Sequence, residues 1–157
     1  MSRRVKMAGA LSIAAAVIVS YYPSLNIGLA GDDLLYPFWA STLSLPEYLN
    51  RYFNPLTPIF SWYRPVFGIY FRILFIFFGS NAFGYHVATV FVHISNSLLL
   101  FSLIARNGNR WRLGFLSALV YSATIPVYSA AVIGIAAQDP LMTTFYLLAV
   151  KTWLDYL

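Results

Sequence analysis

The sequence of 157 residues contains no cysteine and very little charge. Without cysteine, disulfides, thiolate metal sites and cysteine nucleophiles are excluded. Its two histidines are too few for a closed zinc site. Charged residues make up 10% of the chain and apolar residues 60%, whereas about a quarter of a soluble globular domain is charged. We therefore predict an integral membrane protein.

The few charges are unbalanced. Ten basic residues stand against five acidic ones, which gives a net charge of +5. In a membrane protein such an excess indicates topology, because loops on the cytoplasmic side carry more Lys and Arg. The basic residues form short clusters without the polar residues that read bases, so we expect no nucleic-acid partner.

Apolar segments predict an all-α polytopic membrane protein in one transmembrane domain. A loop over residues 31–80 is rich in aromatic residues and prolines, and Trp and Tyr prefer the headgroup level. We expect it to carry surface helices outside the membrane. The first span could instead be a cleaved signal peptide, but no convincing cleavage site follows it. The four transmembrane helices are expected at about residues 8–29, 83–105, 113–128 and 139–156.

Two helices are predicted inside the loop. Ser44 precedes Pro46 and Glu47 in the pattern of a helix start, with a serine cap, proline in the first turn and an acid near the positive dipole end. The segment Pro65–Phe78 is very apolar but shorter than the roughly twenty residues that a span needs. We interpret it as an interfacial or re-entrant helix, with Arg72 snorkelling or paired.

The positive-inside rule supports this number of spans. If Pro65–Phe78 does not cross, the basic clusters share the cytoplasmic side with the N-terminus, and the acidic loops lie on the non-cytoplasmic side. The cytoplasmic basic residues are then Arg3, Arg4, Lys6, Arg106, Arg110 and Arg112. The acids on the opposite side are Asp32, Asp33 and Asp139.

Asp32 and Asp33 are the first candidates for chemistry, because an acidic pair beside a span is costly unless it faces water, a cation or a substrate. Either could be a general base, and Asp33 is the candidate ligand of a divalent metal, Mg or Mn. The alternative is a solvated turn, since Gly31 followed by two aspartates is good turn chemistry. Asp139 opens the fourth span, where it could cap the helix or share a site with the pair.

Other polar residues allow two interpretations each. Arg64 could bind a phosphate bidentately, or it could anchor the chain at the interface before a helix. His86, His93 and Asn96 share one helix face with Thr89. We favour interhelical hydrogen bonds for this face over proton transfer or ligand contact.

Five short motifs occur in a suggestive order. They are Gly31-Asp32-Asp33, Tyr63-Arg64-Pro65, Phe83-Gly84-Tyr85-His86, Pro126, and Gln138-Asp139-Pro140-Leu141. Together they resemble the N-terminal part of the GT-C membrane glycosyltransferases, such as protein O-mannosyltransferases and aminoarabinose transferases. The resemblance implies transfer of a sugar from a polyprenyl-phosphate donor to an acceptor outside the cytoplasm, with inversion at the anomeric carbon.

The resemblance also implies roles for residues. Asp32 or Asp33 would match the acid of the first outer loop that acts as base or metal ligand, and Asp139 would match the acid of the second outer loop. Arg64 would lie near the donor phosphate. The other expected substrate-binding residues are Tyr63, His86 and Gln138.

The chain departs from that family in length, because those enzymes carry many more spans. Two hypotheses follow. The chain is a glycosyltransferase module, either a fragment of a longer enzyme or a subunit completed by a partner. Alternatively, it is a non-catalytic accessory subunit that reuses this scaffold in a larger membrane complex. Membrane lipid and other membrane chains are expected partners in both cases.

Overall fold

The computed structural model describes residues 3–29, 34–56, 63–106, 110–123 and 138–157. All regular secondary structure in these ranges is helical, which confirms the all-α prediction. The helices are α1 (Arg3–Tyr21), the 3-10 helix η1 (Tyr22–Asn26), α2 (Leu35–Thr42), α3 (Leu45–Phe53), α4 (Pro65–Phe78), α5 (Ala82–Ile104), α6 (Trp111–Ser122) and α8 (Gln138–Tyr156).

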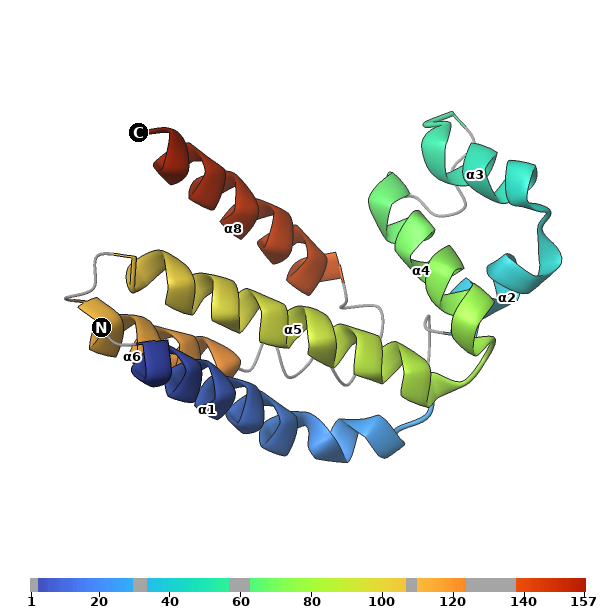
Figure 1. The fold of residues 1–157 in the computed structure, drawn as a ribbon. Helices are drawn as coiled ribbons and strands as arrows, with labels where there is room; N and C mark the ends of the chain where they lie inside the picture. The colour runs from blue at the N-terminus through green and yellow to red at the C-terminus, as the bar shows by residue number, and fades with distance from the viewer. Residues whose placement is uncertain (1–2, 30–33, 57–62, 107–109, 124–137) are drawn as a thin grey trace.

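Helix α5 is the centre of the fold (Figure 1). Helices α1 and α6 lie along one side of it and run in the opposite direction, whereas α8 lies on the other side and runs in the same direction. Helices α2, α3 and α4 form a separate group near the N-terminal end of α5. The chain therefore alternates in direction through α1, α5, α6 and α8, as a bundle of sequential helices does.

The contact between α5 and α6 is close. A Cβ placed on Gly114 would lie 3.0 Å from the carbonyl oxygen of Phe101 and 3.1 Å from the backbone nitrogen of Ala105. Ala118 is fully buried in the same interface, and Ile13 of α1 joins it. Small residues that let backbones approach in this way are typical of helix packing in membranes.

Aromatic side chains form the core of the group α2–α4. Tyr36 packs on Phe67 and Phe71, with ring centroids 5.2 and 4.4 Å apart. Helix α3 packs on α4 at Gly68, where an added Cβ would lie 2.2 Å from the ring of Tyr52. The hydroxyl of Tyr48 donates to the Gly68 carbonyl oxygen at 3.0 Å. The missing side chain of Gly68 is therefore what allows the tyrosines of α3 to reach α4.

The ends of α3 and α4 follow from local sequence. Ser44 caps α3, and the Glu47 carboxylate accepts hydrogen bonds from the Ser44 amide at 3.0 Å and the Ser44 hydroxyl at 2.6 Å. These bonds lower the pKa of Glu47. Helix α4 starts at Pro65, which needs no amide partner in a first turn, and ends at Phe78, just before Gly79, whose φ of 55° favours glycine. The predicted start of α3 and both predicted ends of α4 are confirmed.

Arg72, in the middle of α4, is paired. Its guanidinium donates to the carbonyl oxygen of Ala40 and lies 5.2 Å from the centroid of the Tyr48 ring. Burial raises the pKa of Tyr48 to about 12, so its hydroxyl stays protonated. Of the two expectations for Arg72, snorkelling and pairing, the structure shows pairing.

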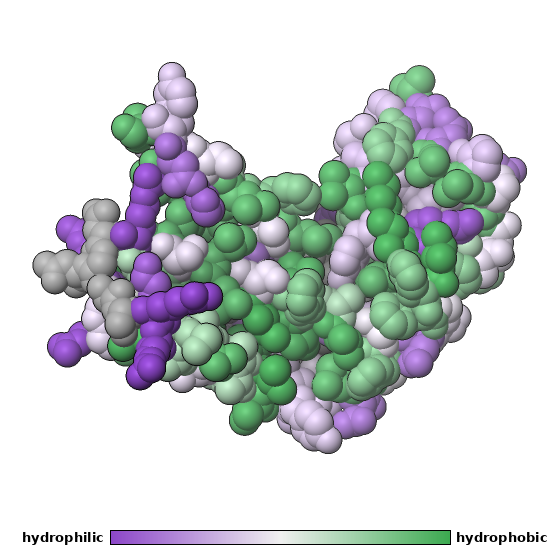
Figure 2. Space-filling view, in the orientation of Figure 1, coloured by the Kyte–Doolittle hydropathy of each residue, from purple (hydrophilic) through white to green (hydrophobic). Residues whose placement is uncertain are grey.

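Within the described residues, two helical stretches are long and apolar enough to cross a membrane: Arg3–Asn26, which joins α1 to η1, and α5. Pro65–Phe78 is a shorter apolar helix. The predicted span 139–156 corresponds to α8, and the predicted span 113–128 is described only as far as Ser122 in α6 and at Ala123. Figure 2 shows apolar residues over the middle of the molecule and hydrophilic ones at its left end and over part of its right side.

Candidate functional site

A pocket of about 470 Å³ lies between the first turns of α4 and α8. Its volume falls within the roughly 300–1,000 Å³ typical of ligand sites. Two of the residues singled out in the sequence, Arg64 and Asp139, line it together although they are far apart in the chain. The lining residues are Arg64, Pro65, Val66, Phe67, Asp139, Leu141, Met142 and Phe145.

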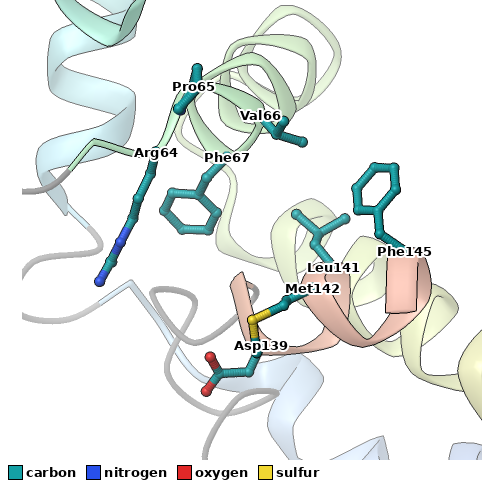
Figure 3. Close-up of a pocket in the computed structure, with 8 residues that line it drawn as sticks. All are labelled: Arg64, Pro65, Val66, Phe67, Asp139, Leu141, Met142 and Phe145. Carbon is teal, nitrogen blue, oxygen red and sulfur yellow. The ribbon is translucent and has the colours of Figure 1, made fainter. Parts of the chain in front are cut away.

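The polar and apolar parts of the lining are separated (Figure 3). The side chains of Arg64 and Asp139 extend toward the same side of the pocket, whereas Val66 and Phe145 lie on the other side. Arg64 is half-buried and Asp139 is exposed. A pocket of this kind suits a ligand with a charged group at one end and an apolar body at the other.

Arg64 is held at the pocket by the start of α4. It is the residue before Pro65, and its carbonyl oxygen accepts the Gly68 amide at 3.1 Å. Phe67, one turn further, is buried and packs edge-on against Phe71 at 4.7 Å. The aromatic core of α2–α4 thereby fixes the backbone from which the guanidinium extends.

Asp139 is positioned through a buried asparagine on α5. The Asn96 side-chain amide donates to the Pro140 carbonyl oxygen at 2.7 Å, and the Thr144 hydroxyl donates to the Asn96 side-chain oxygen, also at 2.7 Å. Asn96 is fully buried, with 0% of its surface exposed. Because Pro140 follows Asp139, these two bonds fix the turn of α8 that carries the carboxylate.

The remaining polar face of α5 bonds to neighbouring segments. His86 Nε2 lies 3.0 Å from the Ile27 carbonyl oxygen, and His93 Nε2 lies 3.4 Å from that of Ser122. A carbonyl oxygen only accepts, so Nε2 carries the proton in both contacts. Both rings are buried. The favoured interpretation, interhelical hydrogen bonds, is confirmed for His93 and Asn96, whereas the Thr89 hydroxyl donates to Tyr85 within α5 and His86 contacts Ile27 just after η1. His86 does not line the Arg64–Asp139 pocket.

The other predicted site residues are distributed as follows. Tyr63 is exposed beside Arg64 but does not line the pocket. Gln138 is the first residue of α8. Asp32 and Asp33 lie outside the described residues. Among the residues that the structure describes, no three histidine or carboxylate side chains are grouped as metal ligands, so a Mg or Mn site involving Asp33 stays a prediction.

Sequence reasoning missed the apolar half of the pocket. Leu141, Met142 and Phe145 of α8 line it, and their spacing of three and four residues places Leu141 and Met142 beside Phe145 on one helix face. That spacing was a readable signal. The segment that faces this part of α8 across the pocket, the first turn of α4, could not be inferred from the sequence. Nothing in the local pattern of either helix indicates that the two meet.

No known protein family matches the chain, and neither does any curated protein or solved structure. Membership of the GT-C superfamily therefore stays a prediction from the order of the motifs. The chemistry of the pocket is the remaining basis for a functional proposal.

Proposed function

We propose that this chain is a membrane-embedded glycosyltransferase module that binds a polyprenyl-phosphate-linked sugar in the Arg64–Asp139 pocket. The observation that supports the proposal is that one pocket is lined by both a guanidinium and several apolar side chains. A polyprenyl phosphate has the complementary form, an anion joined to a long hydrocarbon chain. Arg64 would hold the phosphate bidentately, while Val66, Phe67 and Phe145 contact the isoprenoid.

The reaction we propose is direct displacement at the anomeric carbon. The acceptor hydroxyl oxygen forms a bond to that carbon while the bond from the carbon to the phosphate oxygen breaks. The polyprenyl phosphate leaves with the electron pair, and a carboxylate takes the hydroxyl proton. Asp139 is the described carboxylate at the pocket, and Asp32 or Asp33 is the other candidate for this base.

The proposed membrane arrangement has four spans, formed by α1 with η1, α5, α6 and α8, and a cytoplasmic N-terminus. Helices α2–α4 then belong to an outer loop at the non-cytoplasmic face. Two facts support this arrangement. The helices alternate in direction, and basic residues lie at the start of α1, just after α5 and at the start of α6, which meet at one end of the bundle. The pocket lies at the opposite end of α8, at its first turn.

Donor binding can be tested with farnesyl phosphate and farnesol on the purified chain in detergent. Arg64→Gln should weaken farnesyl phosphate binding by about tenfold or more, since a hydrogen bond to a charged group contributes about 1.5–3 kcal/mol. Farnesol binding should not change. Arg51→Gln is the matched control, because Arg51 is exposed on α3 and lies outside the pocket. Equal binding of farnesyl phosphate by all three proteins would overturn the proposed site.

A variant of Asp139 should distinguish donor binding from sugar transfer. Asp139→Asn removes a negative charge near the proposed phosphate, so farnesyl phosphate should bind as well as to wild type or better. Sugar transfer from a polyprenyl-phosphate sugar should be lost in Asp139→Asn and in Asp33→Asn. Donor binding without turnover in the wild type, with a larger complex intact, would overturn the catalytic proposal and leave the accessory role.

That accessory role has one supporting observation. Helix α8 packs mainly on α5, and large apolar side chains on it remain exposed: Met142, Phe145, Tyr146 and Trp153. An uncovered apolar helix face is a contact surface for lipid or for another membrane chain. In this second candidate function the chain would be a scaffold subunit, covered along α8 by its partner.

A further inference from the structure

The end of the bundle opposite the Arg64–Asp139 pocket is strongly basic. Cations from four separate segments lie there, at the end where Figure 2 shows hydrophilic residues. Helices α1 and α6 begin at this end, and α5 and α8 finish there. The cations are Arg3, Arg4, Lys6, Arg106, Arg110, Arg112 and Lys151.

Only part of this charge is neutralised within the described residues. Asp155 forms ion pairs with Arg106 at 3.3 Å and with Lys151 at 2.6 Å. No described carboxylate forms an ion pair with Arg3 or Lys6 at the start of α1. The basic end therefore keeps a large excess of positive charge, which attracts anions.

A groove between α1 and α5 opens at this basic end. It has a volume of about 460 Å³. Its rim carries Arg3, Lys6 and Arg106, and its walls are almost entirely apolar. The wall residues are Met7, Ala10, Leu98, Phe101, Ser102 and Ala105; the Ser102 hydroxyl already donates to the Leu99 carbonyl oxygen at 2.8 Å.

We infer that this groove is a binding site for an anionic phospholipid of the surrounding membrane. The phosphate lies among the three cations of the rim, and an acyl chain lies along the apolar walls between α1 and α5. A basic pocket between helices on the cytoplasmic side is a recognised site for anionic headgroups. The site shares no residue with the Arg64–Asp139 pocket, so it does not depend on the proposed sugar transfer.

Charge placement gives the main test. Native mass spectrometry of the detergent-purified chain measures the binding of phosphatidylglycerol and of phosphatidylcholine with the same acyl chains. We compare Arg3→Gln/Lys6→Gln with Arg110→Gln/Arg112→Gln, which loses the same charge at the same end but from residues outside the groove. Each cation of the rim should be worth about fivefold, so the first pair should lower phosphatidylglycerol binding about 25-fold. The second pair should lower it less than threefold.

Filling the groove tests the acyl chain separately. Ala10→Phe should weaken phosphatidylglycerol binding at unchanged charge, whereas Ala8→Phe, on the same helix but outside the groove, should not. Glycerol phosphate, which has the headgroup anion without acyl chains, should fail to compete.

Three results would overturn the inference. The first is equal loss in both charge pairs, which would indicate diffuse surface attraction. The second is competition by glycerol phosphate as strong as by the lipid, which would indicate a simple anion site. The third is the absence of any preference for phosphatidylglycerol over phosphatidylcholine in the wild type. Circular dichroism of each variant confirms the helical fold, and because the two charge pairs change only exposed residues, the test does not depend on the Ala10 variant.

Discussion

Asn96→Ala should loosen α8 from the rest of the bundle. The substitution removes two interhelical hydrogen bonds of this fully buried side chain, the one that it donates to Pro140 and the one that it accepts from Thr144. Each such bond contributes about 0.5–1.5 kcal/mol net, and measured values inside membranes are similar. The Thr144 hydroxyl keeps a second acceptor, the Pro140 carbonyl oxygen at 2.9 Å, so no further penalty is expected there.

The expected loss is therefore about 2 kcal/mol, which lowers the ratio of docked to undocked α8 about 30-fold. The matched control is Ser95→Ala. Ser95 is the neighbouring residue, but its hydroxyl donates to Phe91 within α5 at 2.9 Å. Removing it breaks no contact between helices, so the docking of α8 should not change.

The absence of cysteine makes spin labelling straightforward. Labels at Phe91→Cys and Tyr146→Cys, two exposed positions on α5 and α8, report the distance between these helices by electron paramagnetic resonance. We expect one narrow distance distribution in the wild type and in Ser95→Ala, and a broad one in Asn96→Ala. An unchanged distribution in Asn96→Ala, with a thermal shift no larger than in the control, would refute the role assigned to the two bonds.

Two further predictions concern α3. Gly68→Ala should destabilise the packing of α3 on α4 by about 1–3 kcal/mol, because the new Cβ would overlap the Tyr52 ring. The control Gly28→Ala, with nothing within 4 Å of its Cβ, should leave the thermal denaturation temperature unchanged. Equal temperature shifts in the two variants would contradict the close contact assigned to Gly68 and Tyr52. Because the Ser44 hydrogen bonds hold the pKa of Glu47 below its usual 4.5, α3 should be stabilised above about pH 4.5 and lose that contribution as the pH falls through the lowered value. The effect is small for so exposed a group; amide exchange of α3 measured against pH should show it, and Glu47→Gln should abolish the dependence.

Local signals predicted the helices well where both ends were marked. Helix α4 spans Pro65–Phe78 as predicted, and α3 starts directly after the predicted cap Ser44. Such signals act within one turn, so they can be read without knowing the fold. The first helix begins before the predicted span, since α1 starts at Arg3 and charged residues at a helix start do not interrupt backbone hydrogen bonding. The bounds of the span itself stay a prediction.

The sequence by itself determined the helical class, two segments long and apolar enough to cross a membrane, and the inward polar face of α5. These follow from composition and from the period of a helix, which every residue carries locally. Tertiary structure alone decided which carbonyl oxygens the polar face meets, that Tyr52 packs on Gly68, and that Arg64 comes to lie around one pocket with Asp139. Such pairings join segments distant in the chain, and they depend on how whole helices pack, which no local pattern encodes.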